Sequence, residues 1–257
     1  MSCSEKLLIE NGDAVKFLKL LSILARLSPY AKIEKKGDDL IIYSLDKLEL
    51  SAAILKLQGN FCKELEFEKV FKVSTIPKIL KFASPKAIEI TRDYIRISSL
   101  HRRAQREVSI DLVWLDVEYP TLDTSFVARA LSDSYAVRVN EQDLAKVFNL
   151  FMIRDIDEFK LICNGNSIYL QGIGLGITIS HRLQIIESRC FSGTIALRIP
   201  SMYVRMLRYA FDLVENVQIH LKDDMPLVIS GTTTLSTFPV TFYLVVSSRN
   251  DTGDASR

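Results

Sequence analysis

The chain has 257 residues, of which 48% are hydrophobic and 25% charged, so its composition is that of a globular protein with a real core. Lys and Arg number 33 against 31 Asp and Glu, a balance that by itself indicates neither a nucleic-acid nor a membrane partner. No apolar run reaches the roughly 18 residues that a membrane-spanning helix needs, and no pattern of a signal sequence is present. We therefore expect an intracellular protein.

No pattern of catalytic or metal-binding residues can be recognised. The GIGLG run at 172–176 lies between strand-like segments with no helix after it, so it is not a dinucleotide-binding motif. The three histidines form no HExxH or similar arrangement, and the cysteines have no CxxC spacing. The cysteines are expected to be reduced and buried: Cys3, Cys62, Cys163 and Cys190. We expect no enzyme activity, no catalytic residue, no metal and no cofactor.

Two segments of the first half have the apolar period of helices. The first is DAVKFLKLLSILARLSP, for which Asp13 is a plausible cap and Pro29 the stop. The second is STIPKILKFASP, with Ser74 or Thr75 as the cap and Pro85 as the terminator. Between and after them apolar and polar residues alternate with period two, as in REVSIDL, which is typical of half-buried antiparallel strands.

The second half contains two further helical segments. In NEQDLAKVFNLFMI, Asn140 and Asp143 have the spacing of a capping box. The last segment, IPSMYVRMLRYAF, begins at Ile199. Alternating segments such as YAVRV and GITIS predict strands around these helices as well.

The two halves of the chain repeat one plan. KILKFA at Lys78 returns as RMLRYA at Arg205, 127 residues later, and AVKFLKLL at Ala14 corresponds to LAKVFNLF at Leu144, 130 residues later. Two pairs of segments in the same order at nearly the same offset favour a duplication over chance similarity of amphipathic helices. Each half is predicted to run as strand, helix, several strands, helix, several strands.

The predicted helices have an unusual charge composition. Their forty interior residues contain eight bases and no acid, although acids make up 31 of the 257 residues. Solvated helix faces normally mix both signs, so a face of one sign in a nearly neutral protein indicates a polyanion opposite it. No base-reading pattern accompanies the bases, which favours contact with phosphates. A merely solvated basic face remains the alternative. The eight bases are Lys16, Lys19, Arg26, Lys78, Lys81, Lys146, Arg205 and Arg208.

The order of these elements resembles that of sliding clamps of the PCNA type. The similarity is carried by KILKFASPKAIEI, by LAKVFNLFMIRDIDEFKLICNGNSIYLQGIG, by LDVE at the start of a connecting loop, and by DDMPLVI with TFYLVV near the end. Each fragment is short, but their order and spacing span nearly the whole chain.

The resemblance implies an α+β fold of two topologically similar domains, each with two helices packed on antiparallel sheets, and assembly into a closed trimeric ring. It places an N-terminal clamp domain at residues 1–112, a connecting loop at 113–127, a C-terminal clamp domain at 128–246 and a flexible tail at 247–257. The implied partners are duplex DNA bound without sequence preference, other clamp subunits in a homo- or heterotrimer, DNA polymerase, flap endonuclease, DNA ligase and an ATP-driven clamp loader, with no membrane.

The resemblance also implies two kinds of site besides the basic helices. A pocket for the PIP box, a short client segment with one branched aliphatic and two aromatic residues, corresponds to Leu45, Leu50, Leu122, Pro226, Tyr243 and Val245. The edge strands that pair between subunits correspond to segments with Val108, Ile110, Leu112, Ile177 and Ile179. From the residues alone, internal strands are an equally good interpretation of the second set.

Some positions depart from the family pattern. Tyr119-Pro120 stands in the connecting loop where Leu or Gly is more usual, Glu49 stands where a His is typical, and the chain lacks the usual tail motif. These differences concern partner preference. They also suit a checkpoint-type clamp or an obligate subunit of a heterotrimeric archaeal ring. A ligand-binding β protein or an unrecognised enzyme is the alternative from another class.

Overall fold

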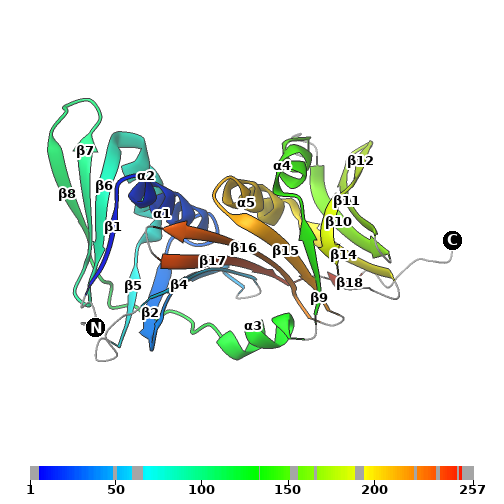
Figure 1. Cartoon of the computed structure of the whole chain (residues 1–257), viewed down its shortest axis with the longest axis horizontal. Helices are drawn as coiled ribbons and strands as arrows, with labels where there is room; N and C mark the ends of the chain where they lie inside the picture. The colour runs from blue at the N-terminus through cyan, green and yellow to red at the C-terminus, as the bar shows by residue number, and fades with distance from the viewer. Residues whose placement is uncertain are drawn as a thin grey trace. The chain divides into compact units, whose positions relative to one another are not determined.

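A computed structural model describes residues 6–48, 51–59, 66–132, 134–150, 156–164, 167–188, 194–222, 225–235, 238–247 and 249–250. The chain divides into two compact units (Figure 1). Unit 1 contains residues 1–122 and 232–242, and unit 2 contains residues 123–231 and 243–257. The domain limits given above stay a prediction.

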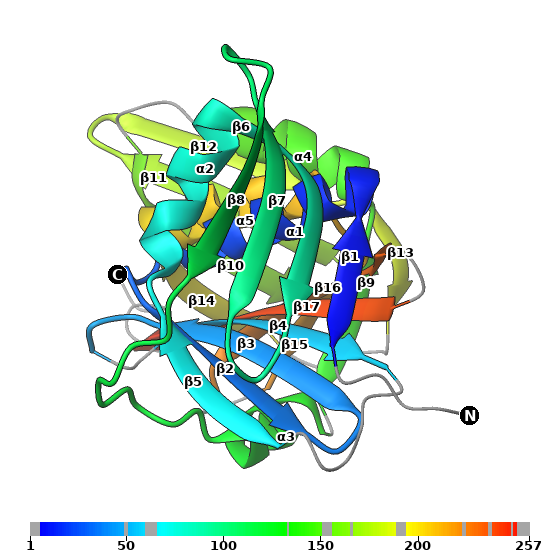
Figure 2. The ribbon, with the colours of Figure 1, turned by 90° about the vertical axis from the view of Figure 1, so that its left-hand side faces the viewer.

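The described residues of unit 1 form two antiparallel sheets and two α-helices. Its elements are β1 (Leu7–Glu10), α1 (Asn11–Leu24), β2 (Ala31–Lys36), β3 (Asp39–Leu45), β4 (Ser51–Gln58), β5 (Phe67–Phe71), the 3-10 turn η1 (Val73–Thr75), α2 (Ile76–Phe82), β6 (Ala83–Ile90), β7 (Ile95–His101) and β8 (Glu107–Leu112). The strands pair in the orders β1-β6-β7-β8 and β4-β3-β2-β5. Helices α1 and α2 lie side by side, and α1 packs on β6 (Figure 2).

Unit 2 repeats this arrangement. Its elements are α3 (Thr124–Leu131), β9 (Tyr135–Val139), α4 (Glu141–Leu150), β10 (Ile156–Asn164), β11 (Ser167–Gly174), β12 (Ile177–Arg182), β13 (Ile185–Ser188), β14 (Thr194–Pro200), α5 (Ser201–Phe211), β15 (Glu215–Leu221), β16 (Leu227–Leu235), β17 (Phe238–Val246) and β18 (Arg249–Asn250), with residues 232–242 of β16 and β17 counted in unit 1. One sheet has the order β12-β11-β10-β14-β18, and β9 pairs with both β13 and β15. Helices α4 and α5 pack together.

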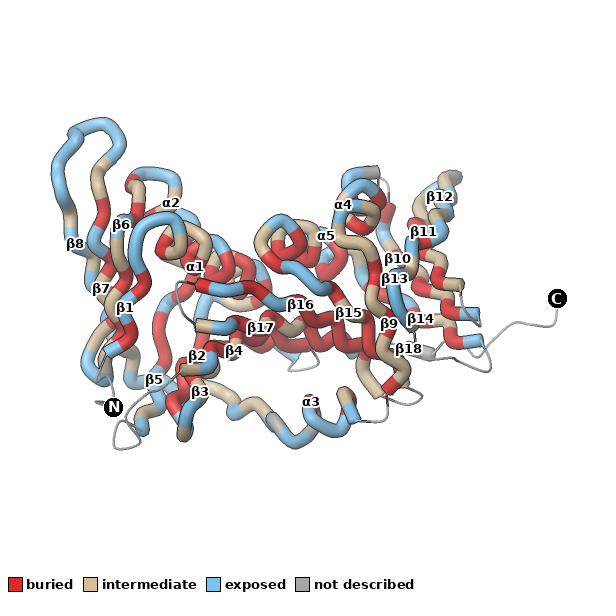
Figure 3. Tube along the Cα trace, viewed as in Figure 1, coloured by how far each residue is buried: buried red, intermediate tan, exposed pale blue. Residues whose placement is uncertain are grey.

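The predicted plan of strand, helix, strands, helix, strands is confirmed in both units. The exception is α3, a short helix that the sequence did not predict and that begins inside the expected connecting loop. Each helix pair is amphipathic in the expected sense. Its inner face is buried with the adjoining strands (Figure 3), as shown by Phe17 and Leu21 of α1, while Phe148 of α4 stacks on Phe211 of α5 with ring centroids 5.4 Å apart.

Of the two helix caps predicted for the first half, Asp13 is wrong, and Thr75 occupies the N-cap position of α2 without forming a side-chain cap. α1 begins at Asn11, whose φ of 55° lies in the left-handed region that Asn tolerates, and Asp13 falls inside the first turn instead of capping it. There its carboxylate still favours the positive end of the helix dipole. In the second segment the Thr75 hydroxyl donates backwards to the Lys72 carbonyl at 2.7 Å, so it caps no helical N–H.

The sequence suggested that Pro85 terminates the second helix, and this prediction is wrong. α2 ends at Phe82, and Pro85 lies in β6, beside a register irregularity between Pro85 and Ala87. Proline is tolerated at such a bulge because a ladder donor is missing there anyway. The capping box at Asn140 is half formed: the Asn140 Oδ1 accepts the Asp143 N–H at 2.9 Å, but the Asp143 carboxylate binds the Gln184 N–H at 2.8 Å instead of returning the contact.

Gly231 in β16 gives a test of the packing in unit 2. A Cβ at this position would lie 2.5 Å from Cγ2 of Val214, closer than real Cβ contacts allow. We expect Gly231→Ala to lower the free energy of unfolding by about 1–3 kcal/mol through overpacking, measured by urea denaturation. Gly12→Ala is the control, because a Cβ there meets nothing within 4 Å. Equal stabilities of the two variants would contradict the close packing at Gly231.

Candidate functional site

In unit 1 the predicted bases lie on the outer faces of α1 and α2. Lys19, Lys78 and Lys81 are exposed and Lys16 is half-buried, whereas the residues between them pack inward. Arg26 is exposed but lies two residues beyond the end of α1, in the turn where its N–H donates to the Ile23 carbonyl at 3.0 Å. The expected helical stripe therefore holds for the lysines and ends before Arg26.

In unit 2 the corresponding bases occupy the same faces of α4 and α5. Lys146 and Arg205 are exposed, and Arg208 is half-buried with its guanidinium 5.9 Å from the Tyr209 ring centre. Apart from Arg26, none of the predicted bases forms an ion pair with a carboxylate in the described part of the chain. A row of uncompensated cations on each helix pair can neutralise phosphates without reading bases.

The strands with the predicted interface residues lie at sheet edges. Among the described residues β8 is the last strand of its sheet. The His101 N–H donates to the Arg106 carbonyl at 2.9 Å, which makes this a hydrogen-bonded pair. Since such pairs alternate along an antiparallel ladder, the N–H groups of Val108, Ile110 and Leu112 point to β7, and that of Ser109 points to the free edge.

The edge of β12 has the same design. β12 is the outermost described strand of its sheet, and the Leu183 N–H donates to the Ile168 carbonyl at 2.8 Å. Hydrogen-bonded and non-hydrogen-bonded pairs alternate along the ladder from this bond. The N–H of Thr178 therefore points outward, and those of Ile177 and Ile179 point to β11. Both segments are thus edge strands, and their use as a subunit interface stays a prediction. An unpaired edge is a template for another chain.

The connecting segment is held on unit 1 by polar contacts that the sequence did not reveal. The Tyr119 hydroxyl accepts the Leu45 N–H at 2.9 Å and donates to the Tyr30 carbonyl at 3.2 Å. The Leu122 N–H donates to the Tyr43 hydroxyl at 3.2 Å. Tyr119, which departs from the family pattern, therefore links the connecting segment to unit 1 by hydrogen bonds.

A buried charge cluster lies beneath this segment. Lys32, which is 3% exposed, contacts the Glu34 and Glu68 carboxylates and donates to the Thr121 hydroxyl at 3.2 Å. The Tyr43 hydroxyl donates to Glu34 at 2.7 Å. Burial raises the pKa of the Glu34 carboxyl, but the hydrogen bonds from Lys36 and Tyr43 and the nearby positive charges outweigh it, so that pKa lies below its ordinary value. Burial and Glu34 raise the pKa of Tyr43, so its hydroxyl keeps its proton.

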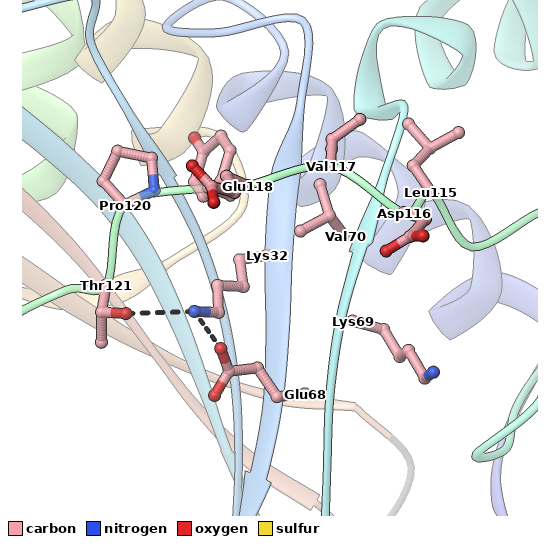
Figure 4. A pocket seen from close by; sticks show the side chains of 11 residues that line it. Lys32, Glu68, Lys69, Val70, Leu115, Asp116, Val117, Glu118, Pro120 and Thr121 are labelled. Atoms are coloured by element: carbon pink, nitrogen blue, oxygen red, sulfur yellow. Dashed lines mark hydrogen bonds and ion pairs between the residues drawn. The ribbon is translucent and has the colours of Figure 1, made fainter.

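A cleft of about 830 Å³ opens between β5 and the connecting segment (Figure 4). Lys32, Glu68 and Lys69 form one wall, and residues 115–121 arch over the other. A backbone bond from the Leu115 N–H to the Val70 carbonyl, 2.8 Å long, closes one end of the arch. The lining mixes charged side chains with apolar ones such as Val70 and Leu115, so the cleft differs from the apolar pocket that the resemblance implies. Of the predicted pocket residues that the structure describes, none lines it.

The predicted pocket residues fall in both units. In unit 1, Leu45 is 8% exposed and Leu122 is half-buried. In unit 2, Pro226 and Tyr243 are half-buried and Val245 is buried. Leu50 and Glu49 lie outside the described residues. Whether these side chains form one pocket stays a prediction.

In the described part of the chain no group of three or more His, Cys, Asp and Glu side chains could hold a metal ion. Cys163 is a free, buried thiol whose pKa is raised by burial, and Cys3, Cys62 and Cys190 lie outside the described residues. No helix among the described residues is long and apolar enough to cross a membrane.

The duplicated arrangement of two helices on antiparallel sheets is the clamp fold of the PCNA type. Among solved structures the chain is similar to PCNA from Thermococcus kodakaraensis, with a TM-score of 0.70 and 14% sequence identity. The match covers 95% of this chain and 99% of that one. Comparison by sequence finds no matching protein family and no matching curated protein. The likeness therefore establishes the fold.

Proposed function

We propose that this chain is a subunit of a sliding clamp, a closed ring of three subunits that surrounds duplex DNA and tethers replication and repair enzymes to it. The observation that carries the proposal is the repeated helix pair on a fold of the PCNA type, because the bases on its outer faces, Arg26 excepted, form no ion pair with a carboxylate in the described part of the chain. Exchangeable phosphate contacts on a pseudo-symmetric surface hold the duplex loosely, which permits sliding. The protein acts as a processivity factor without catalytic chemistry.

The ring is tested by topology. We expect native mass spectrometry to show a species of three times the mass of one chain, either from this chain alone or after mixing with sister subunits. Once placed on a closed circular duplex by its ATP-driven loader, the ring should resist a high-salt wash, because it is linked to the circle. Cutting the circle should release it. Equal retention on closed and cut DNA would falsify the clamp proposal.

Binding of client enzymes is tested at Leu122. Its side chain is half-buried in a polar segment, TLDTS, where nothing in the sequence requires an apolar residue. If Leu122 anchors a PIP-box peptide, Leu122→Ala should lower peptide affinity at least tenfold, since truncating a central anchor costs about 2 kcal/mol. The backbone bond to Tyr43 survives the change, so the segment should keep its position.

Fluorescence titration of a labelled PIP-box peptide measures this effect. Val113→Ala is a matched control, because Val113 is 73% exposed in the same connecting segment and is not among the predicted pocket residues. Trimer formation and thermal stability should be unchanged in both variants. Equal peptide affinities of wild type and Leu122→Ala would place the pocket elsewhere.

A further inference from the structure

The tip of the β7–β8 hairpin is a strongly basic projection outside the helix faces. Its sequence from His101 to Arg106 is HRRAQR, which contains three arginines and no acid. Arg102, Arg103 and Arg106 are all exposed, and none pairs with a carboxylate in the described part of the chain. The next acid, Glu107, is bound to Lys86 at 2.9 Å, and this bond lowers the pKa of Glu107. The three guanidiniums are therefore uncompensated.

The tip is fixed by its own hydrogen bonds. His101 and Arg106 are joined by a backbone bond of 2.9 Å, and the Gln105 N–H donates to the His101 carbonyl at 2.9 Å. The Ala104 N–H donates to His101 Nδ1 at 3.0 Å, and the Gln105 side-chain amide donates to the Arg102 carbonyl at 2.8 Å. Since the turn is already ordered, a ligand that binds the arginines need not pay to order the backbone.

The hairpin stands beside the basic face of α2. The Arg102 N–H donates to the Phe82 carbonyl at the end of α2, over 3.1 Å, and His101 pairs with Ala83. Figures 1 and 2 both show the tip rising past α2. Phe82 is 55% exposed, with Lys81 Nζ 5.6 Å from its ring centre. Lys78, Lys81 and the three arginines thus belong to one end of unit 1, with an aromatic ring among them.

We propose that Arg102, Arg103 and Arg106 bind the phosphodiester backbone of DNA as a contact additional to the helix faces. One guanidinium group can donate two parallel hydrogen bonds to two oxygens of a phosphate. Three exposed guanidiniums are therefore well suited to bind a phosphodiester backbone. The Phe82 ring offers a stacking surface to an unpaired base, so the site accepts single strands as well as duplex. This inference rests on the proposed function, because it assumes that DNA meets the same end of unit 1.

The test uses the full chain and fluorescence anisotropy, with a labelled duplex and a single strand of the same sequence over a range of salt concentrations. Replacing Arg102, Arg103 and Arg106 together by Gln should lower affinity at least tenfold at moderate salt. The slope of log affinity against log salt should become shallower by about one or more, since each lost phosphate contact contributes about 0.9 for duplex and 0.7 for single strands. Replacing the same three by Lys keeps the charge and should restore most of the affinity.

The matched control replaces Lys47, Lys69 and Lys72 by Gln, removing the same charge from exposed positions elsewhere in unit 1. The DNA affinity of this control should stay within about threefold of the wild-type value. Phe82→Ala tests the stacking: a loss of affinity confined to the single strand supports stacking on an unpaired base, and an equal effect on both DNA forms contradicts it.

Two results overturn the inference alone. One is an unchanged DNA affinity of the hairpin variant in an experiment where Ala replacements of the helix bases do weaken DNA binding. The other is a hairpin variant that loses binding to phosphatidylserine vesicles while keeping DNA affinity, which would make the ligand a membrane surface. If the wild-type chain binds neither DNA form, the inference fails alone as well, because the proposed function is decided separately by retention on closed and cut circles after loading. If only the hairpin variant loses affinity, the inference stands and the role of the helix faces fails.

Discussion

Ser109→Pro and Thr178→Pro are expected to open the proposed ring while leaving each subunit folded. The N–H groups of both residues point away from their own sheets, so proline removes donors that only a neighbouring subunit would use. Each lost ladder bond contributes about 0.5–1.5 kcal/mol, and local disruption of the pairing adds to this. We expect the dissociation constant of the assembly to rise at least tenfold in either variant.

The measurement combines native mass spectrometry with thermal unfolding of the same samples. Ile110→Pro is the informative comparison, because the Ile110 N–H belongs to the ladder with β7 and its loss should destabilise the subunit itself. Ser109→Ala retains the donor and should assemble normally. An intact trimer in both Ser109→Pro and Thr178→Pro would show that these edges are not the subunit interface.

Replacing Lys16, Lys81, Lys146 and Arg208 together by Ala is expected to reduce retention on closed circular DNA at least tenfold. The four positions take one base from each of α1, α2, α4 and α5, so every helix of the proposed DNA-facing surface loses charge. Single replacements should have mild effects, because three subunits share the contact. Stability should change little, since Lys81 and Lys146 are exposed, and Lys16 and Arg208 are half-buried without an ion pair to a carboxylate in the described part of the chain.

The assay is salt-dependent retention after loading, together with stimulation of a DNA polymerase. A control variant with Lys47, Lys69, Lys72 and Arg92 replaced by Ala loses the same charge from other exposed positions. If the control and the helix variant were retained equally, the effect would be one of net charge. If the helix variant were retained like the wild type, the DNA surface would lie elsewhere.

The sequence predicted the parts of the fold that follow from local periodicity. The four paired helices and their bases were found because apolar spacing and charge are properties of the helix itself, as for Lys78 and Lys81 in α2. α3 was missed because its eight residues begin inside the polar run TLDTS and have no counterpart in the repeated plan, whereas the phrase that forms α2 returns in α5. Helix ends at Asn11 and Phe82 depend on backbone geometry and on the next strand, which propensity does not specify.

The polar support of the connecting segment was not predictable for a different reason. Lys32 and Glu34 alternate with apolar residues in β2, a pattern that indicates a solvated strand face. Both are buried because Thr121, Tyr119 and their neighbours, some ninety positions later, cover that face and complete its hydrogen bonds. A local sequence pattern cannot predict that a segment so distant in the chain buries these side chains. The outward N–H groups of Ser109 and Thr178 likewise follow from register, which only the pairing of strands defines.

Unit 1 includes residues 232–242, although its other residues end at 122. During synthesis the first 122 residues therefore emerge from the ribosome long before the strand segments that complete their unit have been made. Until then the nascent unit lacks the last pieces of its core, among them Val240 and Phe242, which are almost fully buried in the finished protein. Unit 1 cannot finish folding until residues 232–242 have been synthesised, so its apolar surface stays exposed while most of unit 2 is made. A truncation before residue 232 would for this reason damage the beginning of the protein as well.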